Sequence, residues 1–154
     1  MGEYTAKLEW QRDGAVFTDN CFSRAHRWRF DGGADVAGSA SPLIVPPPLS
    51  DPAGIDPEEA FVAAIASCHM LWFLALAARA GFVVDHYRDA AVGIMERIDS
   101  GKQAITRVTL RPDIGFSHDK QPSPEELRSL HHKAHDNCFI ANSVCTEITV
   151  EPAA

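Results

Sequence analysis

The sequence predicts an α+β fold, because its strand patterns and helix patterns come in groups and do not alternate strictly. Residues 4–10 and 25–31 alternate polar and apolar side chains, which is typical of strands. Two helix starts follow, with strand patterns between them and after the second. A chain of 154 residues has the length of one domain, so we expect residues 1–154 to form a single domain.

Residues 1–55 predict strands followed by a proline-rich arm. The strand pattern at 25–31 places Trp28 and Phe30 on one face. The stretch Ser39–Pro57 contains six prolines, so neither a helix nor a central strand can run through it. A long arm of this kind in a small domain is often functional or packed against a partner.

A helix is predicted to begin after Asp56. Asp56 is a good N-cap residue, Pro57 suits the first helical position, and Glu59 completes a capping box, which gives Glu59 a structural role. We expect this helix to run to about Ala80 and to end at Gly81.

The second half of the chain predicts strands, a helix and a final strand. Residues 83–99 and 103–116 indicate two long strands joined by a hairpin at Ser100-Gly101. A second capping pattern predicts a helix over residues 123–137, and residues 146–150 indicate a closing strand.

The first helix raises the alternative of a membrane span, because from Ala60 to Ala78 only Ser67, Cys68 and His69 are not apolar. Against a span, these polar residues would lie near the bilayer centre, and no basic cluster flanks the segment. A soluble helix that is apolar all round must be surrounded by protein, and one small domain can hardly surround it alone. We therefore expect no membrane insertion and burial of this helix inside a dimer.

Composition excludes several classes of protein. The 45% hydrophobic and 23% charged residues are typical of a globular domain. The net charge of −7, without a run of lysine and arginine, argues against nucleic-acid binding. Residues 1–20 carry several charges and no apolar stretch, so we expect no signal peptide and a cytoplasmic protein with reduced cysteines.

The four cysteines are too few and too scattered for a disulfide scaffold. Cys68 lies in the middle of the first helix, where a free cysteine is usually a small buried residue. Cys138 lies where the second helix pattern breaks, and nearby amide donors at such a break can favour a thiolate. We expect Cys21 and Cys145 to be bystanders, with Cys145 as a possible substitute in a disulfide.

The histidines suggest an alternative, a metal site. His131, His135 and Cys138 share one helix face and could ligate a metal with His69 or Cys68 as a fourth ligand. The simpler interpretation is a solvated helix face, and the chain has neither a CxxC pair nor an HExxH motif. We therefore expect no metal.

Three motifs carry a resemblance to a known family, and they are Asp56–Phe61, Ala66–His69 and Ala134–Cys138. Cys68 follows Glu58 by 10 residues, and Cys138 follows Cys68 by 70. With these motifs and this spacing, residues 55–151 resemble the OsmC/Ohr family of osmotically inducible and organic hydroperoxide resistance proteins.

The resemblance implies an intertwined homodimer in which antiparallel sheets surround a long buried central helix. It also implies a peroxidase that reduces alkyl or lipid hydroperoxides to alcohols without a bound cofactor. Cys68 would attack the peroxide and become a sulfenic acid, and Cys138 would resolve it as a Cys68–Cys138 disulfide. A dithiol reductant, such as a lipoyl protein, would reopen that disulfide. The alternatives are an OsmC-like protein without peroxidase activity and a Cys/His metal-binding module.

The resemblance further implies that Glu58 positions an arginine beside the reactive thiolate, which a guanidinium can stabilise. Residues 39–55 contain no arginine, which leaves Arg24 or Arg27. Strand alternation places Arg27 on a solvated face, so we choose Arg24. On a straight helix Glu58 lies about 15 Å from Cys68, and we therefore expect Glu58 and the arginine to serve the cysteine of the other subunit.

Overall fold

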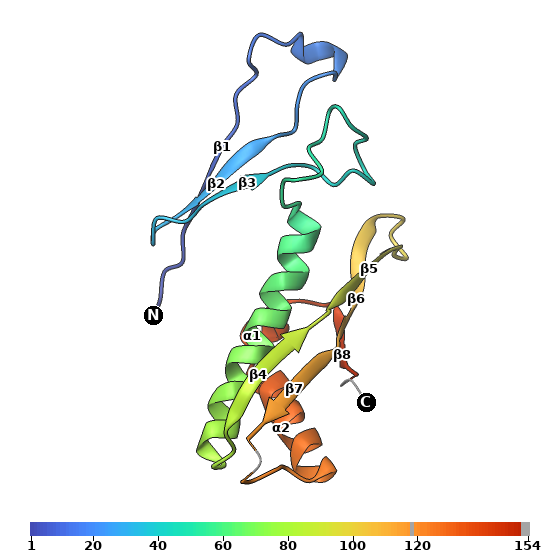
Figure 1. The fold of residues 1–154 in the computed structure, drawn as a ribbon. Helices are drawn as coiled ribbons and strands as arrows, with labels where there is room; N and C mark the ends of the chain where they lie inside the picture. The colour runs from blue at the N-terminus through green and yellow to red at the C-terminus, as the bar shows by residue number, and fades with distance from the viewer. Residues whose placement is uncertain (118, 152–154) are drawn as a thin grey trace. The chain divides into compact units, whose positions relative to one another are not determined.

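The computed structural model describes residues 1–117 and 119–151 (Figure 1). The chain folds into two compact units, residues 1–60 and 61–154. Strands and helices are both present, and most strand pairs are antiparallel, so the α+β prediction is confirmed.

The first unit is built on a three-stranded antiparallel sheet of β1 (Ala6–Glu9), β2 (His26–Phe30) and β3 (Asp35–Gly38). The strands β1 and β2 lie within their predicted ranges. The sequence analysis missed β3, because this strand is only four residues long and has no clear apolar alternation. Between β1 and β2 lies a short 3-10 helix, η1 (Phe17–Asp19).

The proline-rich arm contains no helix and no strand, as predicted. Its two ends are tied together by the backbone, because Ile55 N–H donates to Ala37 O at 2.9 Å and Ser39 N–H donates to Ile55 O at 3.1 Å. The hydroxyl of Ser39 also accepts the N–H of Asp51 at 2.9 Å. The arm is therefore an ordered loop that returns the chain to the edge of the sheet before the first helix.

The helix α1 (Pro57–Arg79) begins and ends as predicted. Glu59 N–H donates to Asp56 Oδ1 at 2.7 Å, and Asp56 N–H donates to Glu59 Oε2 at 3.2 Å, which is a complete capping box. At the other end Gly81 adopts φ +77°, a left-handed conformation that suits glycine and stops the helix. By length and composition α1 could cross a membrane, with a mean hydropathy of 2.0 and 22% of the window buried, although core helices of soluble proteins meet the same criteria.

The prediction of two long strands over residues 83–99 and 103–116 is wrong, because each stretch divides into two strands. They are β4 (Val84–Asp89), β5 (Val92–Arg97), β6 (Gln103–Leu110) and β7 (Pro112–Phe116). The strands pair antiparallel as β4 with β7 and β5 with β6, and a hairpin with Gly101 at φ +80° joins β5 to β6. The strand pairing is interrupted between β6 and β7, because Pro112 has no N–H to donate. The N–H of Arg111 donates to the side-chain oxygen Asp89 Oδ1 at 2.7 Å instead of to a neighbouring strand.

The remaining elements of the second unit are α2 (Pro124–Asn137), the 3-10 helix η2 (Ala141–Ser143) and β8 (Glu147–Val150). Ser123 and Glu126 form the predicted capping box of α2. The closing strand β8 pairs with β6 in parallel.

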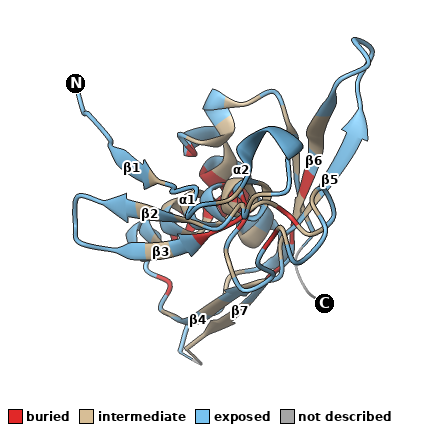
Figure 2. Cartoon of the chain, turned by 90° about the horizontal axis from the view of Figure 1, so that it is seen from above, coloured by how far each residue is buried: buried red, intermediate tan, exposed pale blue. Residues whose placement is uncertain are grey.

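Two apolar clusters form the core of the second unit. One cluster joins α1 to α2 through five buried residues, which are Phe73, Ala77, Phe82, Leu130 and Ala134. The other places Ile65 of α1 against Val108 and Leu110 of β6. In the second unit most buried positions, red in Figure 2, therefore fall on α1, α2 and the strands that pack with them. This core fixes the middle of α1 beside the C-terminal half of α2.

Candidate active site

The structure brings Cys68 and Cys138 together within the second unit. Cys68 lies half-buried in the middle of α1, and the Cys138 side chain is fully buried at the C-cap of α2. The side chain of Cys68 lies close enough to the Cys138 thiol to contribute to its raised pKa. Two thiols that are 70 positions apart in the sequence are therefore neighbours in the fold, and both are free.

The surroundings of Cys138 hold this residue in its protonated form. Burial, first, and the neighbouring Cys68 side chain raise the pKa of the Cys138 thiol. The turn into η2 opposes them, because Ala141 N–H donates to Cys138 Sγ at 3.4 Å and Ile140 N–H also stabilises the thiolate. The amide donors expected at this helix end are present, but the expectation that they give Cys138 a thiolate character is wrong, because burial outweighs them.

An aromatic pair flanks the two thiols. Trp72 lies one helical turn after Cys68, and Phe139 directly follows Cys138. Their rings pack edge to face with centroids 5.5 Å apart. Phe139 is nevertheless 67% exposed, so an apolar surface lies next to the cysteines.

A buried histidine pair lies next to Cys68 in the chain. His69 Nε2 and His131 Nδ1 are 3.0 Å apart, and His131 also packs on the Phe73 ring with centroids 4.5 Å apart. The interpretation of the α2 histidines as a solvated face is wrong for His131, which is buried because this part of α2 faces α1. Among residues 1–117 and 119–151, no group of three or more His, Cys, Asp or Glu side chains is arranged to hold a metal ion.

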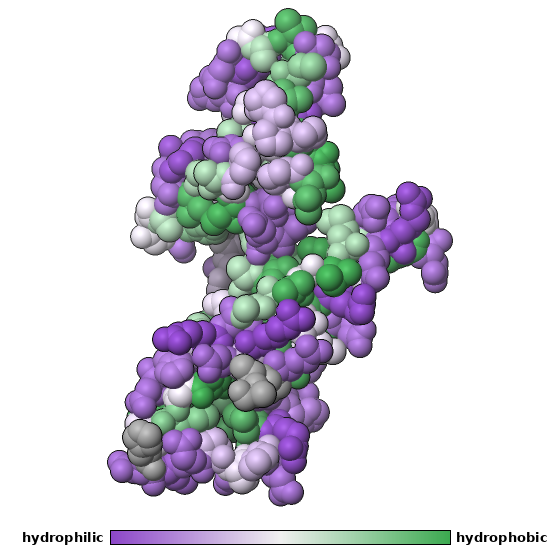
Figure 3. Space-filling view, turned by 45° about the vertical axis from the view of Figure 1, so that its right-hand side comes forward, coloured by the Kyte–Doolittle hydropathy of each residue, from purple (hydrophilic) through white to green (hydrophobic). Residues whose placement is uncertain are grey.

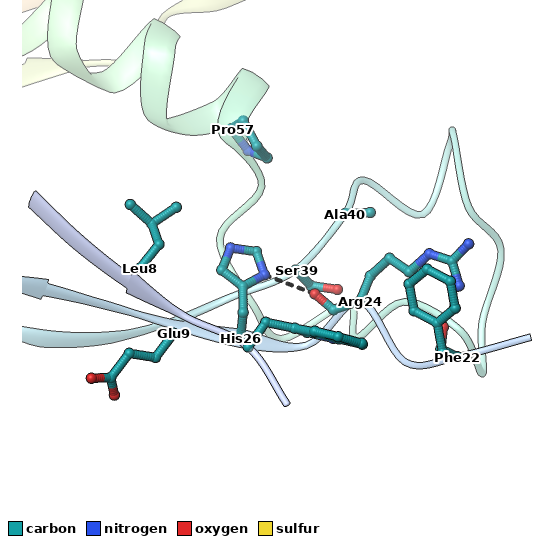
Figure 4. Close-up of a pocket in the computed structure, with 9 residues that line it drawn as sticks. Leu8, Glu9, Phe22, Arg24, His26, Ser39, Ala40 and Pro57 are labelled. Carbon is teal, nitrogen blue, oxygen red and sulfur yellow. Dashed lines mark hydrogen bonds between the residues drawn. The ribbon is translucent and has the colours of Figure 1, made fainter. Parts of the chain in front are cut away.

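In the first unit, Arg24 lines a cavity of about 430 Å³ (Figure 4). The cavity is lined by Leu8, Glu9, Trp10, Phe22, Arg24, His26, Ser39, Ala40 and Pro57. The guanidinium of Arg24 lies over the Phe22 ring at 3.8 Å and donates to Asn20 Oδ1 at 2.7 Å and Asn20 O at 3.0 Å. It also donates to the carbonyl of Phe22. Arg24 is thus held by local partners at the wall of this cavity.

His26 fixes the backbone of Arg24. Trp28 Nε1–H donates to His26 Nε2 at 2.5 Å, so Nε2 is the acceptor of this ring. The Nδ1–H of His26 therefore donates to Arg24 O, 2.8 Å away. This chain of contacts links the sheet to the segment that carries the arginine.

Glu58 occupies the first turn of α1 and is half-buried. It directly follows Pro57, which lines the same cavity as Arg24. Within the residues that the structure describes, neither Glu58 nor Arg24 forms an ion pair. Arg27, in contrast, pairs with Asp35 across the sheet at 2.8 Å, and its hydrogen bond is the main cause of the lowered pKa of Asp35.

Of the four predicted site residues, the structure brings the two cysteines together. Arg24 and Glu58 lie in the first unit, and their role toward a cysteine stays a prediction. The sequence analysis missed the His69–His131 pair and the Phe139 ring. No spacing rule connects His69 to His131, because the two residues are 62 positions apart.

Residues 50–153 match the profile of the family described as OsmC-like protein. The chain is similar to the solved structure of an OsmC-like protein of unknown function from Vibrio cholerae, with 52% identity and a TM-score of 0.97 over 99% of this chain and 100% of that one. No protein of curated function matches the sequence.

More distant structures share the fold. An organic hydroperoxide resistance protein OsmC from Legionella pneumophila is 15% identical, with a TM-score of 0.71 over 100% of this chain and 98% of that one. The organic hydroperoxide resistance protein OhrB of Bacillus subtilis is 19% identical, with a TM-score of 0.66 over 97% and 98%.

Proposed function

Since the chain belongs to the OsmC-like protein family, we propose that it is a thiol-dependent peroxidase that reduces organic hydroperoxides to alcohols. The observation that carries the proposal is the pairing of a half-buried Cys68 with a fully buried Cys138. Organic hydroperoxide resistance proteins share the fold, which agrees with this chemistry. The proposed reaction takes place in the cytoplasm.

The environments of the two sulfurs support different roles for them in the proposed reaction. Cys68 is the more accessible thiol, and Cys138 is held protonated, so Cys68 is the nucleophile. The Cys68 thiolate attacks the distal peroxide oxygen, the O–O bond breaks, and the alkoxide leaves with a proton as the alcohol. Cys68 is then a sulfenic acid.

Cys138 completes the half-reaction. Its sulfur displaces the hydroxyl of the Cys68 sulfenic acid, which leaves as water, and the two residues form a disulfide. An external dithiol, such as a lipoyl group on a protein, reduces that disulfide and is itself oxidised to a disulfide. No bound cofactor takes part in this proposal.

The apolar surface beside the thiols favours hydroperoxides with a hydrocarbon part. The Trp72–Phe139 pair offers aromatic contacts to an alkyl or lipid chain, which hydrogen peroxide cannot use. Binding energy from that chain can orient the peroxide for attack.

We propose that the active unit is a homodimer. Opposite the buried stripe of α1 lies an exposed face of small and apolar residues, which are Ala64, Ser67, Leu71, Ala75 and Ala78. Leu71 is 61% exposed, and Figure 3 shows further hydrophobic surface in green. Small side chains let two helices approach closely, so a second copy of α1 can cover this face.

A shared site follows from the dimer proposal, with Glu58 and Arg24 of one subunit serving Cys68 of the other. Mixing two inactive variants, Cys68→Ser and Glu58→Ala, tests it. Activity should return in the mixed dimers, because one of the two sites in each combines an intact Cys68 from one subunit with an intact Glu58 and Arg24 from the other. Mixed dimers that form but stay inactive argue against a shared site.

Hydroperoxide consumption tests the function itself. With dihydrolipoamide as reductant, the protein should reduce cumene hydroperoxide faster than hydrogen peroxide. Cys68→Ser should abolish the reaction, and Cys145→Ser, which changes an exposed cysteine, should not. A native protein that consumes no organic hydroperoxide with any dithiol would contradict the proposal.

A further inference from the structure

A second pocket lies in the second unit, between α2 and β8. It has a volume of about 290 Å³ and is lined by Arg128, His131, His132, His135, Ile148 and Val150. This volume lies just below the usual range for ligand pockets, about 300–1,000 Å³, so the pocket suits a small ligand. Among the described residues, none of its lining side chains is acidic. The four α2 residues recur at helical spacing and so share one face.

His131, one of the lining residues, has a buried nitrogen without a hydrogen-bond partner in the described part of the chain. His131 is 5% exposed, and its Nδ1 is turned toward His69 in the interior. The Nε2 at the other edge of the ring is buried and makes no hydrogen bond within residues 1–117 and 119–151. His135 Nδ1 is in the same situation. Polar atoms that are buried at a pocket wall indicate a ligand that supplies the missing hydrogen bonds.

The His69–His131 hydrogen bond decides which proton faces the pocket. If His131 donated from Nδ1, the neutral His69 ring would carry its own proton on Nδ1, which is buried and has no partner among the residues that the structure describes. An orphaned buried N–H is rare and costly. If His69 donates from Nε2, its Nδ1 is only an unused acceptor, and His131 presents an Nε2–H to the pocket. Each arrangement leaves one buried N–H unpaired within the described residues, and only the N–H of the second lies on a residue that lines the pocket, so an acceptor bound in the pocket favours the second arrangement.

We propose that this pocket binds a small monocarboxylate. Arg128 is exposed on α2 and forms no ion pair within the described part of the chain, so its guanidinium is available for the carboxylate. The Nε2–H of His131 supplies a second donor. Ile148 and Val150 lie two residues apart on β8, share one face of the strand, and give an apolar wall for a short hydrocarbon chain.

Titrations with hexanoate, acetate and inorganic phosphate, followed by NMR on the full chain, test the proposal. Hexanoate should shift the backbone amides of residues 128–135 and 147–150 saturably and should bind more tightly than acetate or phosphate. Arg128→Gln should weaken hexanoate at least about tenfold, which corresponds to the loss of one charge-assisted hydrogen bond. Lys133→Gln removes a positive charge from the same helix outside the pocket and should leave the affinity unchanged.

The tautomer of His131 gives a readout that does not depend on any variant. With hexanoate bound, long-range proton–nitrogen NMR should find the proton of His131 on Nε2. A proton on Nδ1 in that complex, equal affinity for phosphate and hexanoate, or no saturable binding would each overturn the proposal. Zinc binding to the α2 histidines that Arg128→Gln leaves unchanged would overturn it as well. None of these outcomes depends on peroxidase activity.

Discussion

His69 and His131 form a buried imidazole pair, with Nε2 of the first 3.0 Å from Nδ1 of the second. One hydrogen bond thereby joins the middle of α1 to the middle of α2. Burial is the main reason that the pKa of each ring falls to about 4, and the neighbouring imidazole of His131 lowers the pKa of His69 further. The pair is therefore neutral at pH 7, and its protonation makes the stability of the fold depend on pH.

Stability should fall in mild acid because of this pair. In the unfolded chain both rings take up protons near pH 6.5, whereas the folded rings do so only near pH 4. The unfolded state binds more protons between these values, so the free energy of unfolding falls as the pH drops from 6.5 to 4. With two groups the slope reaches at most about 2.7 kcal/mol per pH unit. Urea unfolding at a series of pH values measures it.

His132 provides the control, because its side chain is 78% exposed. His132→Gln should leave the slope between pH 4 and 6.5 unchanged, and His69→Gln should reduce it by about half. Comparing each variant with the native protein also cancels the contribution of the carboxylates to the slope. The carboxylates with lowered pKa values, which affect stability at lower pH, are Asp35, Glu96 and Glu126. Equal slopes in the native protein and His69→Gln would contradict the prediction.

Removing the N-cap of α2 should destabilise the second unit. Ser123 Oγ accepts Glu126 N–H at 3.2 Å, and Glu126 Oε2 accepts Ser123 N–H at 2.8 Å. Ser123→Ala removes the acceptor of Glu126 N–H and keeps the backbone N–H that donates to Glu126 Oε2, so the free energy of unfolding should fall by about 1 kcal/mol. Ser129→Ala, at an exposed position inside the same helix, should be neutral or slightly stabilising. Equal effects of the two substitutions in urea unfolding would count against the cap.

Arg24 should matter for catalysis and Arg27 should not. Among the residues that the structure describes, the partners of the Arg24 guanidinium are carbonyl and amide oxygens and the Phe22 ring, so it can turn toward an anionic thiolate. Arg27 is committed to Asp35. We expect Arg24→Gln to lower kcat/KM for cumene hydroperoxide by about 100-fold, the usual effect of losing one donor to a developing charge. Arg27→Gln should change it less than about twofold.

Local signals predicted the ends of both helices and the turn at Gly101, because capping and left-handed glycine depend on a few neighbouring residues. The division of residues 83–116 into four strands escaped prediction. The division depends on the register that places Pro112 opposite Asp89, and that register is set by the pairing of β4 with β7 along their whole length. Short strands such as β3 likewise exist only because a partner strand pairs with them.

The candidate site shows the same limit. The Cys68–Cys138 spacing pointed to the pair through a resemblance, and the fold places the two thiols together. The protonation of Cys138 was not predictable, since it depends on how far burial outweighs the amides of Ile140 and Ala141. The partnership of His69 with His131 needed the packing of α1 on α2.

The most direct test of the central claim is the fate of the two thiols after one equivalent of cumene hydroperoxide. In a Cys21→Ser/Cys145→Ser variant, Cys68 and Cys138 are the remaining cysteines. Peptide mapping and intact mass should show one Cys68–Cys138 disulfide, the loss of two hydrogens, and one equivalent of cumyl alcohol. Two free thiols after the reaction, or a Cys68 sulfinic acid beside an unchanged Cys138 thiol, would contradict the account.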